Sequence, residues 1–190
     1  MSGFLQYTRP FRILTRPGEA GDLARRIPTI PRELGYSSPE RRDLTERIAM
    51  MRSALHEMYP RPSHPPYQGS ILEDDLRRVV GAMSHTDPAS RTPDDLIGRY
   101  LADIPDPMSY DYMGSLGSLT PGGGRALLRD WRERNPDRGL VWYSLPRAAP
   151  FYERIGARAI PESPAGSNFD FLLEPGQQIR RRGGAIRAAA

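Results

Sequence analysis

A strand–glycine–helix stretch in the second half of the chain most constrains what it can fold into. An apolar, strand-like run from Met108 to Leu119 breaks into the glycines Gly122–Gly124. A helical pattern follows, in which Leu127, Leu128 and Trp131 recur at helix spacing. Glycines let a backbone approach a phosphate closely, and the free N–H groups and dipole of a helix start favour negative charge. The stretch therefore predicts an anion-binding turn.

The residues after this stretch predict the rest of a sheet. Gly139–Leu145 is rich in β-branched and aromatic residues, as strands are. Pro146–Ala157 is a short helical segment that a proline opens and a glycine closes. Two more short strands are expected near residues 157–161 and 168–174. The order strand, helix, strand, strand predicts a domain of the α/β (α+β) class.

Two motifs in this half resemble a known family. Pro-Gly-Gly-Gly-Arg-Ala-Leu-Leu at 121–128 is followed by Phe-Tyr-Glu-Arg-Ile-Gly at 151–156, and together they resemble the GCN5-related N-acetyltransferases, the GNAT superfamily. The resemblance covers residues 110–174. It implies a mixed, mostly antiparallel central sheet flanked by helices, with acetyl-CoA as the acyl donor. It also implies direct attack by an amine on a protein, a small molecule or an aminoacyl-tRNA.

The resemblance also implies roles for individual residues. The pyrophosphate of acetyl-CoA would lie over the glycine turn, and a strand N–H would polarise the thioester carbonyl. Tyr152 would protonate the departing thiolate, although a packed aromatic is an equal alternative. Asp111 is the nearest candidate base on the central strand, or else a solvated residue at its start. The expected cofactor-binding residues are Leu116, Ser118, Leu119, Thr120, Gly122, Gly123, Gly124, Arg125 and Ala126.

The sequence departs from the family pattern at two positions. Leu119 stands where the family has Arg or Gln, a position that mainly offers a backbone N–H, and Ala157 replaces a Phe. Because of these departures, a second hypothesis is a catalytically degenerate protein that binds CoA or a partner without turnover. A third hypothesis is an adaptor for RNA or a protein partner, led by the arginine-rich surface.

Composition limits the classes of protein. At 190 residues the chain is expected to form one domain over 1–175, with a divergent half (1–107), a cofactor-binding half (108–175) and an Arg-rich disordered tail (176–190). Cysteine is absent and the three histidines are scattered, so we expect no metal site. No apolar run reaches the length of a membrane span.

The charged residues are unusual, because all 27 basic residues are arginine. A GC-rich genome explains this most simply. The absence of lysine also fits an acetyltransferase that cannot modify itself, or a bacterial toxin or effector that escapes ubiquitination in a host. We expect a cytoplasmic location. The alternative is export to a target cell without a classical signal peptide. A homodimer is one expected oligomeric state.

The first half of the chain predicts a strand and two helices. The strand is expected over Phe4–Thr15 and a short helix over Gly18–Ile27. A longer helix runs to Tyr59, opened by Ser37 and Glu40 at capping-box spacing. Three of its methionines could line an acceptor pocket, but core packing is the preferred role: Met50, Met51 and Met58.

The region from 72 to 104 permits two interpretations. Its periodicity alone predicts two helices, the first of them opened by a capping box of Ser70 and Glu73. The resemblance favours two strands, over Arg77–His85 and Leu96–Ile104, because the later motifs need a sheet in which to sit. We expect the strands.

Overall fold

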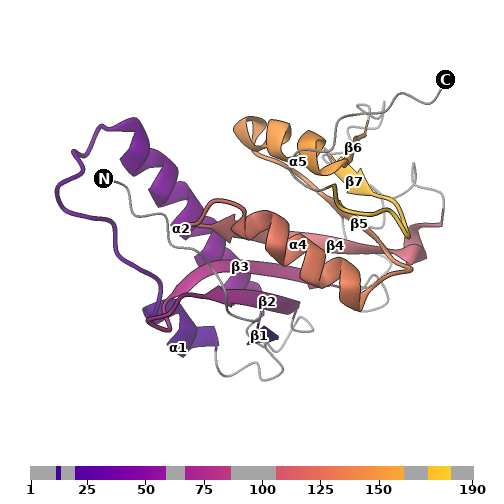
Figure 1. Ribbon diagram of the computed structural model, residues 1–190, viewed down its shortest axis with the longest axis horizontal. Coiled ribbons are helices and arrows are strands. Elements are labelled where there is room, and N and C mark those ends of the chain that lie inside the picture. Colours follow the sequence, from indigo (N-terminus) through magenta and orange to yellow (C-terminus); the bar gives the residue numbers. More distant parts are fainter. Residues whose placement is uncertain (1–11, 14–19, 59–66, 87–105, 161–170, 181–190) are drawn as a thin grey trace.

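The computed structural model describes residues 12–13, 20–58, 67–86, 106–160 and 171–180 (Figure 1). One seven-stranded sheet, in the order β1-β2-β3-β4-β5-β7-β6, runs through the described residues. The strands are β1 (Arg12–Ile13), β2 (Gln68–Glu73), β3 (Val79–Thr86), β4 (Tyr110–Ser118), β5 (Gly139–Trp142), β6 (Arg158–Ala159) and β7 (Phe171–Leu173). The helices are α1 (Ala20–Arg25), α2 (Pro39–Glu57), α4 (Gly123–Arg134) and α5 (Ala149–Ile155), with 3₁₀ turns η4 (Pro107–Ser109) and η5 (Pro146–Ala148).

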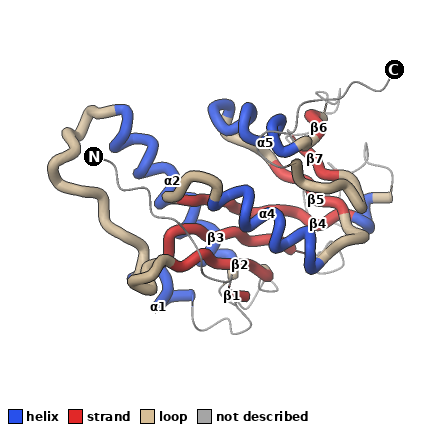
Figure 2. The backbone as a smooth tube through the Cα atoms, in the orientation of Figure 1, coloured by secondary structure: helices blue, strands red, loops and turns tan. Residues whose placement is uncertain are grey.

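The sheet is mixed and mostly antiparallel, which confirms the expected fold class. All described neighbours pair antiparallel except β4 and β5, which pair in parallel. That parallel contact joins only Tyr110–Tyr112 to Gly139–Val141. Because β4 continues to Ser118 while β5 ends at Trp142, the two strands then part (Figure 2). Past Tyr112, β4 has no strand partner on this side among the described residues.

Two apolar cores lie on opposite faces of the sheet. Helices α4 and α5 cover one face, where Leu127, Trp131 and Ile155 are fully buried. Helix α2 covers the other with Met51 and Leu55, and α1 packs beside it (Figure 1). Opposite faces receive alternate residues of a strand, so β4 gives Met113 and Leu116 to the α4 core, while its Gly117 lets the backbone of α2 approach on the other face.

A β-bulge interrupts the pairing of β3 with β4. Met83 pairs with Leu116 and His85 with Met113, so Ser84 alone faces two residues of β4, Gly114 and Ser115. A bulge of this kind bends the strand and re-aims its side chains. Gly114 and Ser115 both contact residues of α2.

Helix α2 begins one residue later than the capping box predicted. Ser38 is the N-cap, and its Oγ accepts a hydrogen bond from the N–H of Arg41 at 3.1 Å. The expected Ser37–Glu40 pair is therefore wrong, because Pro39 at the first helical position places the cap immediately before it. The helix ends at Glu57. The predicted short helix is confirmed as α1, whereas of the first predicted strand only β1 lies within the described residues.

The ambiguous region contains strands where the structure describes it. β3 confirms the strand expected over Arg77–His85, and the strand expected over Leu96–Ile104 lies outside the described residues. The predicted capping residues Ser70 and Glu73 instead belong to β2, a strand that the sequence did not suggest. A tight turn joins β2 to β3, in which Asp74 Oδ1 accepts from the N–H groups of Leu76 and Arg78 at 3.0 and 2.8 Å.

The domain continues past the predicted boundary at residue 175. Ile179 is buried in the core with 6% of its surface exposed, and the N–H of Arg180 donates to the carbonyl of Ile155 at 3.0 Å. Gln177 donates to the carbonyl of Gly156. Residues 176–180 therefore belong to the domain.

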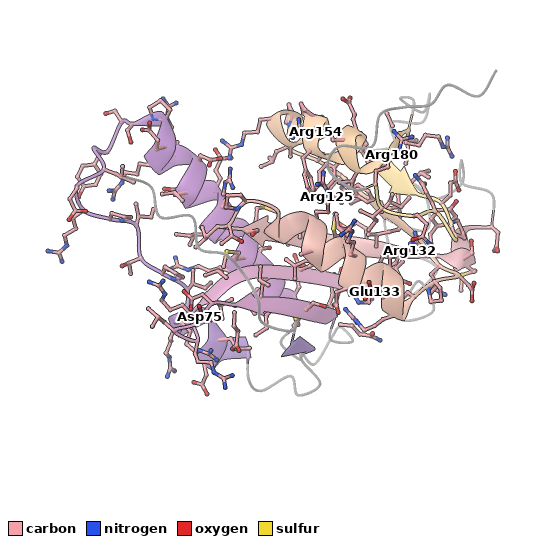
Figure 3. All side chains as sticks on the ribbon, in the orientation of Figure 1. Asp75, Arg125, Arg132, Glu133, Arg154 and Arg180 are labelled. Atoms are coloured by element: carbon pink, nitrogen blue, oxygen red, sulfur yellow. The ribbon has the colours of Figure 1, made fainter. Side chains whose placement is uncertain are left out.

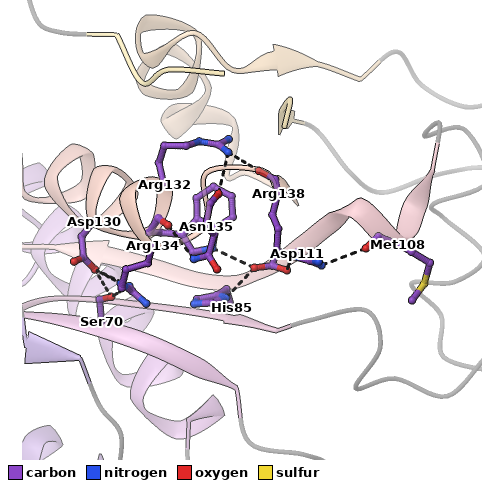
Figure 4. Close-up of polar contacts among 10 residues, drawn as sticks. Ser70, His85, Met108, Asp111, Asp130, Arg132, Arg134, Asn135 and Arg138 are labelled. Carbon is purple, nitrogen blue, oxygen red and sulfur yellow. Dashed lines mark hydrogen bonds and ion pairs between the residues drawn. The ribbon is translucent and has the colours of Figure 1, made fainter. Parts of the chain in front are cut away.

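A buried carboxylate ties the start of β4 to α4 and to the segment before β5 (Figure 4). Asp111 is 3% exposed, and its Oδ1 lies 2.5 Å from Arg138 Nε. Its Oδ2 accepts from Trp131 Nε1 at 3.3 Å and lies 3.3 Å from His85 Nδ1. Burial alone would raise the pKa of Asp111, but the neighbouring His85 and Arg138 outweigh it and lower that pKa.

We expect a chain ending at Pro175 to be less stable than one ending at Arg180. The shorter chain loses the buried Ile179 side chain, which contributes about 1.5–3 kcal/mol. Urea unfolding followed by the fluorescence of the two buried tryptophans measures the difference. Equal midpoints and slopes for the two chains would show that residues 176–180 add nothing to the fold.

The Asp111→Asn variant should lose about 1.5–3 kcal/mol of unfolding free energy at pH 7, because a charge-assisted hydrogen bond to Arg138 disappears. A lowered folded pKa stabilises the protein above the ordinary aspartate value of about 3.9. That contribution is lost as the pH falls through the folded pKa. Urea titrations of both proteins should therefore show a gap that narrows below about pH 4, and a gap independent of pH would contradict this role.

Candidate cofactor site

A groove opens where β4 leaves β5. Its volume is about 370 Å³, and its walls come from α2, the end of β4, the glycine turn, and η5 with α5. Met50 lines it from α2, while Met51 and Met58 are buried in the core as preferred. The groove thus joins segments that are far apart in the sequence, and the parting of two parallel strands creates it.

The three glycines of the turn meet three different demands. Gly122 has φ = +84°, a left-handed conformation that favours glycine, and it is the N-cap of α4. Gly123 faces inward, where a Cβ atom would lie 2.1 Å from Ser118 Oγ and 2.6 Å from Thr120 Oγ1. Gly124 lines the groove, and a Cβ there would meet Phe151 Cζ at 3.4 Å and Leu116 Cδ2 at 3.9 Å, both ordinary contacts.

The turn presents unused hydrogen-bond donors at the start of α4. The N–H of Gly123 donates to the carbonyl of Thr120 at 3.1 Å, and that of Ala126 to Gly122 at 3.0 Å. Within the described parts of the chain, the N–H groups of Gly122 and Gly124 donate to no acceptor. Two open donors at a helix N-terminus suit an anion.

The structure brings five of the nine expected cofactor residues to the groove. Those that line it are Leu116, Ser118, Thr120, Gly122 and Gly124. Gly123, Arg125 and Ala126 belong to the turn and α4 but do not line it. Ser118 Oγ also accepts from the N–H of Thr120 at 3.2 Å, which holds the turn in shape.

Leu119 does not offer the backbone donor expected of it. Its N–H donates to the carbonyl of Val80 at 2.8 Å, and its side chain packs against the core under α2. The expectation is wrong because β4 stays joined to β3 at this point. An apolar residue suits the position, since it faces the core rather than the groove.

Three arginines, none of them predicted for the site, line the groove. Arg47 on α2 pairs with Asp43 at 2.7 Å, and Arg147 on η5 forms an ion pair with Glu46 on α2. Arg154 extends from α5 and pairs with no carboxylate of the described residues (Figure 3). These charges come together only in the folded chain, so no local pattern in the sequence could have indicated them.

Tyr152 belongs to the core and also lines the groove. It is 6% exposed, and the centroid of its ring lies 4.8 Å from that of Trp142 and 5.0 Å from that of Phe151. Burial raises the pKa of Tyr152 well above its usual value, so the hydroxyl keeps its proton at neutral pH. Packing and a role in the site are therefore compatible.

Asp111 does not belong to the site. It lies at the start of β4, while the groove begins at Leu116, five residues and about 16 Å along the strand. Its two oxygens are occupied by Arg138 and Trp131. Asp111 is therefore not a candidate base. It lies on β4, as predicted, but at the end of the strand away from the groove.

No group of three or more metal-ligating side chains occurs in the part of the chain that the structure describes. None of the described helices is long and apolar enough to cross a membrane.

Comparisons with known proteins find similarity only among solved structures. No protein-family model and no curated protein sequence matches the chain. The N-acetyltransferase YlbP of Bacillus subtilis, solved in complex with coenzyme A, aligns over 89% of this chain and 98% of its own at 15% identity and a TM-score of 0.47. FeeM, an N-acyl amino acid synthase from uncultured soil microbes, aligns over 86% and 87% at 16% identity and a TM-score of 0.49.

A third structure, from Corynebacterium glutamicum ATCC 13032, is described as histone acetyltransferase HPA2 and related acetyltransferase. It aligns over 87% of this chain and 95% of its own at 16% identity and a TM-score of 0.48. These likenesses concern the overall fold, and the chemistry of the groove rests on this chain's own residues. In its strand pairing, the chain has the mixed, mostly antiparallel sheet that its resemblance to the GNAT superfamily implies.

Proposed function

We propose that the chain is a divergent GNAT-superfamily N-acetyltransferase that transfers an acetyl group from acetyl-CoA to an amine. One observation carries the proposal. The open N–H groups of Gly122 and Gly124 begin α4 at the end of a groove that the parting of β4 and β5 creates. A thioester cofactor with an anionic pyrophosphate and a long uncharged arm fits such a groove.

The anionic end of the cofactor would lie over the glycine turn. The two N–H groups would donate to pyrophosphate oxygens, and the helix dipole adds attraction. Arg154 supplies a positive charge from the facing helix. The ion pair of Arg147 with Glu46 joins the two walls, so we expect it to rearrange when the groove fills.

The uncharged arm would run along the free edge of β4. Past Tyr112 alternate backbone N–H and C=O groups of this strand face no partner strand on the β5 side among the described residues. Such groups can hydrogen-bond an amide-containing chain as an added strand would. An N–H near Leu116–Ser118 would polarise the thioester carbonyl and stabilise the charge that develops on its oxygen.

Tyr152 would assist the departing sulfur as a hydrogen-bond donor. Because burial raises its pKa, it is a weaker acid than a thiol, whose pKa is about 8.5. Complete transfer of its proton to a thiolate would therefore be uphill. A hydrogen bond to the developing charge needs no such transfer and still lowers the barrier.

The open donors and the groove favour catalysis or CoA binding over the adaptor hypothesis. The toxin or effector role, the homodimer and the cytoplasmic location remain predictions from the sequence.

Calorimetric titration with acetyl-CoA tests the cofactor site, using two substitutions at one position. Gly124→Ala should bind within about twofold of the unchanged chain, since its methyl group makes only ordinary contacts. Gly124→Glu should lose roughly tenfold or more, because a carboxylate would stand where the pyrophosphate lies. A folded wild-type chain that binds no acetyl-CoA would reject the proposal, as would equal affinities of the two variants.

Tyr152→Phe should lower kcat roughly tenfold to a hundredfold, the effect of one hydrogen bond to a charged group. The affinity for acetyl-CoA should stay unchanged, because the ring that packs on Trp142 is kept. The matched control is Tyr36→Phe, which removes a hydroxyl from an exposed residue that does not line the groove. Unchanged turnover in Tyr152→Phe would leave Tyr152 with packing alone.

A further inference from the structure

A carboxylate that the groove does not use lies on the α2 face of the sheet. Glu57, the last residue of α2, is half-buried against the bulge of β4. Its Oε1 lies 3.1 Å from Ser53 Oγ and 2.9 Å from Ser115 Oγ, and its Oε2 accepts a hydrogen bond from Ser84. The N–H of Ser115 donates in turn to Ser84 Oγ at 3.0 Å. Hydroxyl groups thus fix the carboxylate and the bulge to each other.

The carboxylate touches the backbone of the central strand. A Cβ atom on Gly114 would lie 2.2 Å from Glu57 Oε2 and 2.8 Å from Tyr67 Cε2. Position 114 must therefore be glycine for the carboxylate and the ring to stand where they do. Gly117 lines the groove only three residues further along β4, about 10 Å away.

Three tyrosines extend from this carboxylate toward the surface. The centroids of the Tyr67 and Tyr112 rings are 6.5 Å apart, and those of Tyr112 and Tyr143 are 6.0 Å apart, both pairs edge to face. Tyr143 is 47% exposed, so the series reaches solvent. Burial raises the pKa of Tyr112 most, and Tyr143, Tyr67 and the charge of Glu57 raise it further. The three rings and the carboxylate therefore interact electrostatically, and they cluster where β4 and β5 part.

The chemistry of this cluster suits a positively charged amine. A carboxylate has about four acceptor positions, and among the described residues the three serine hydroxyls approach three of them, two on Oε1 and one on Oε2. Ammonium groups form charge-assisted hydrogen bonds with carboxylates and are attracted to aromatic faces. An anionic ligand would be repelled by the carboxylate, and an uncharged one would lack the attraction of a cation to the aromatic faces.

We infer that Glu57, with Tyr67, Tyr112 and Tyr143, forms the acceptor site and selects aliphatic primary amines in their ammonium form. The inference rests on the proposed acetyltransferase function and specifies its acceptor. The site lies on the α2 side of β4, and the cofactor's acyl end reaches the strand from the groove. The bulge fixed by the serines sets the distance between the two.

The transfer step balances with the groups present. One proton of the ammonium passes to the Glu57 carboxylate while the amine nitrogen forms its bond to the acyl carbon, so the bond formation drives the transfer. The C–S bond breaks with its electron pair on sulfur. The second proton of the amine leaves with that sulfur as the CoA thiol, so the products are the amide, the thiol and the protonated carboxyl group, which then loses its proton to water.

The release of CoA thiol measures this reaction without interference from protein thiols, because the chain contains no cysteine, and the rate without protein is subtracted. The acceptor probes are n-butylamine and cadaverine, with aniline as an amine that is uncharged at neutral pH. Three variants are compared with the unchanged chain: Glu57→Gln, Tyr143→Leu, and the control Glu40→Gln at the exposed start of α2. Thermal unfolding establishes that each variant is folded, and calorimetry gives its affinity for acetyl-CoA.

We expect turnover with both alkylamines and little with aniline. Glu57→Gln should raise the KM for alkylamines roughly tenfold or more, because one charge-assisted hydrogen bond is lost. Tyr143→Leu should raise that KM roughly twofold to fivefold through the loss of an aromatic face. The affinity for acetyl-CoA should not change, and Glu40→Gln should behave as the unchanged chain.

Three results would overturn the inference while the cofactor site stands. The first is an unchanged amine KM in folded Glu57→Gln and Tyr143→Leu. The second is aniline turned over as well as the alkylamines. The third is a chain that binds acetyl-CoA but releases no thiol with any alkylamine. Absence of acetyl-CoA binding by the unchanged chain would overturn both proposals.

Discussion

The short parallel contact between β4 and β5 is the constraint on which the rest of the site depends. Only three residue pairs join the two strands, from Tyr110–Gly139 to Tyr112–Val141. If the pairing continued, the N–H and C=O groups along this edge of β4 would bond to β5, and the groove would be closed. Because it stops, β4 enters the glycine turn with no strand of the described residues along its β5 side. The cofactor groove and the start of α4 then lie at the same end of the strand.

The bulge adds a second constraint on the same strand. Ser84 faces both Gly114 and Ser115, so side chains of α2 meet β4 where it leaves β5. The Asp111 cluster holds the other end of β4 to α4 and to Arg138. One end of the strand is thus fixed by buried charges, and the other end is left free to bind. This division between a rigid start and an open end explains why two carboxylates near one strand, Asp111 and Glu57, have such different surroundings.

The sequence predicted those elements whose structure depends on residues close together in the chain. The glycine turn and the helix after it, and the proline-opened helix closed by Gly156, depend on a few neighbouring residues and were found. What depends on strand order was not found. Arg47 and Arg147 line one groove although 100 positions separate them. Asp111 was predicted as a base because the sequence indicates which strand carries it, but not which end of that strand borders the groove. β2 escaped prediction because its spacing imitates a helix and the turn at Asp74 lies within that pattern.

Backbone amide shifts on titration with CoA test the central claim most directly. In ¹⁵N-labelled protein, each amide in contact with the cofactor reports its own environment, whatever the acceptor. We expect the largest shifts at Gly122 and Gly124, with smaller ones along Leu116–Ser118, and none around Asp111. Saturating CoA that leaves the amides of the glycine turn unmoved, or that shifts only the far end of β4, would contradict a cofactor site built on the parting of these two strands.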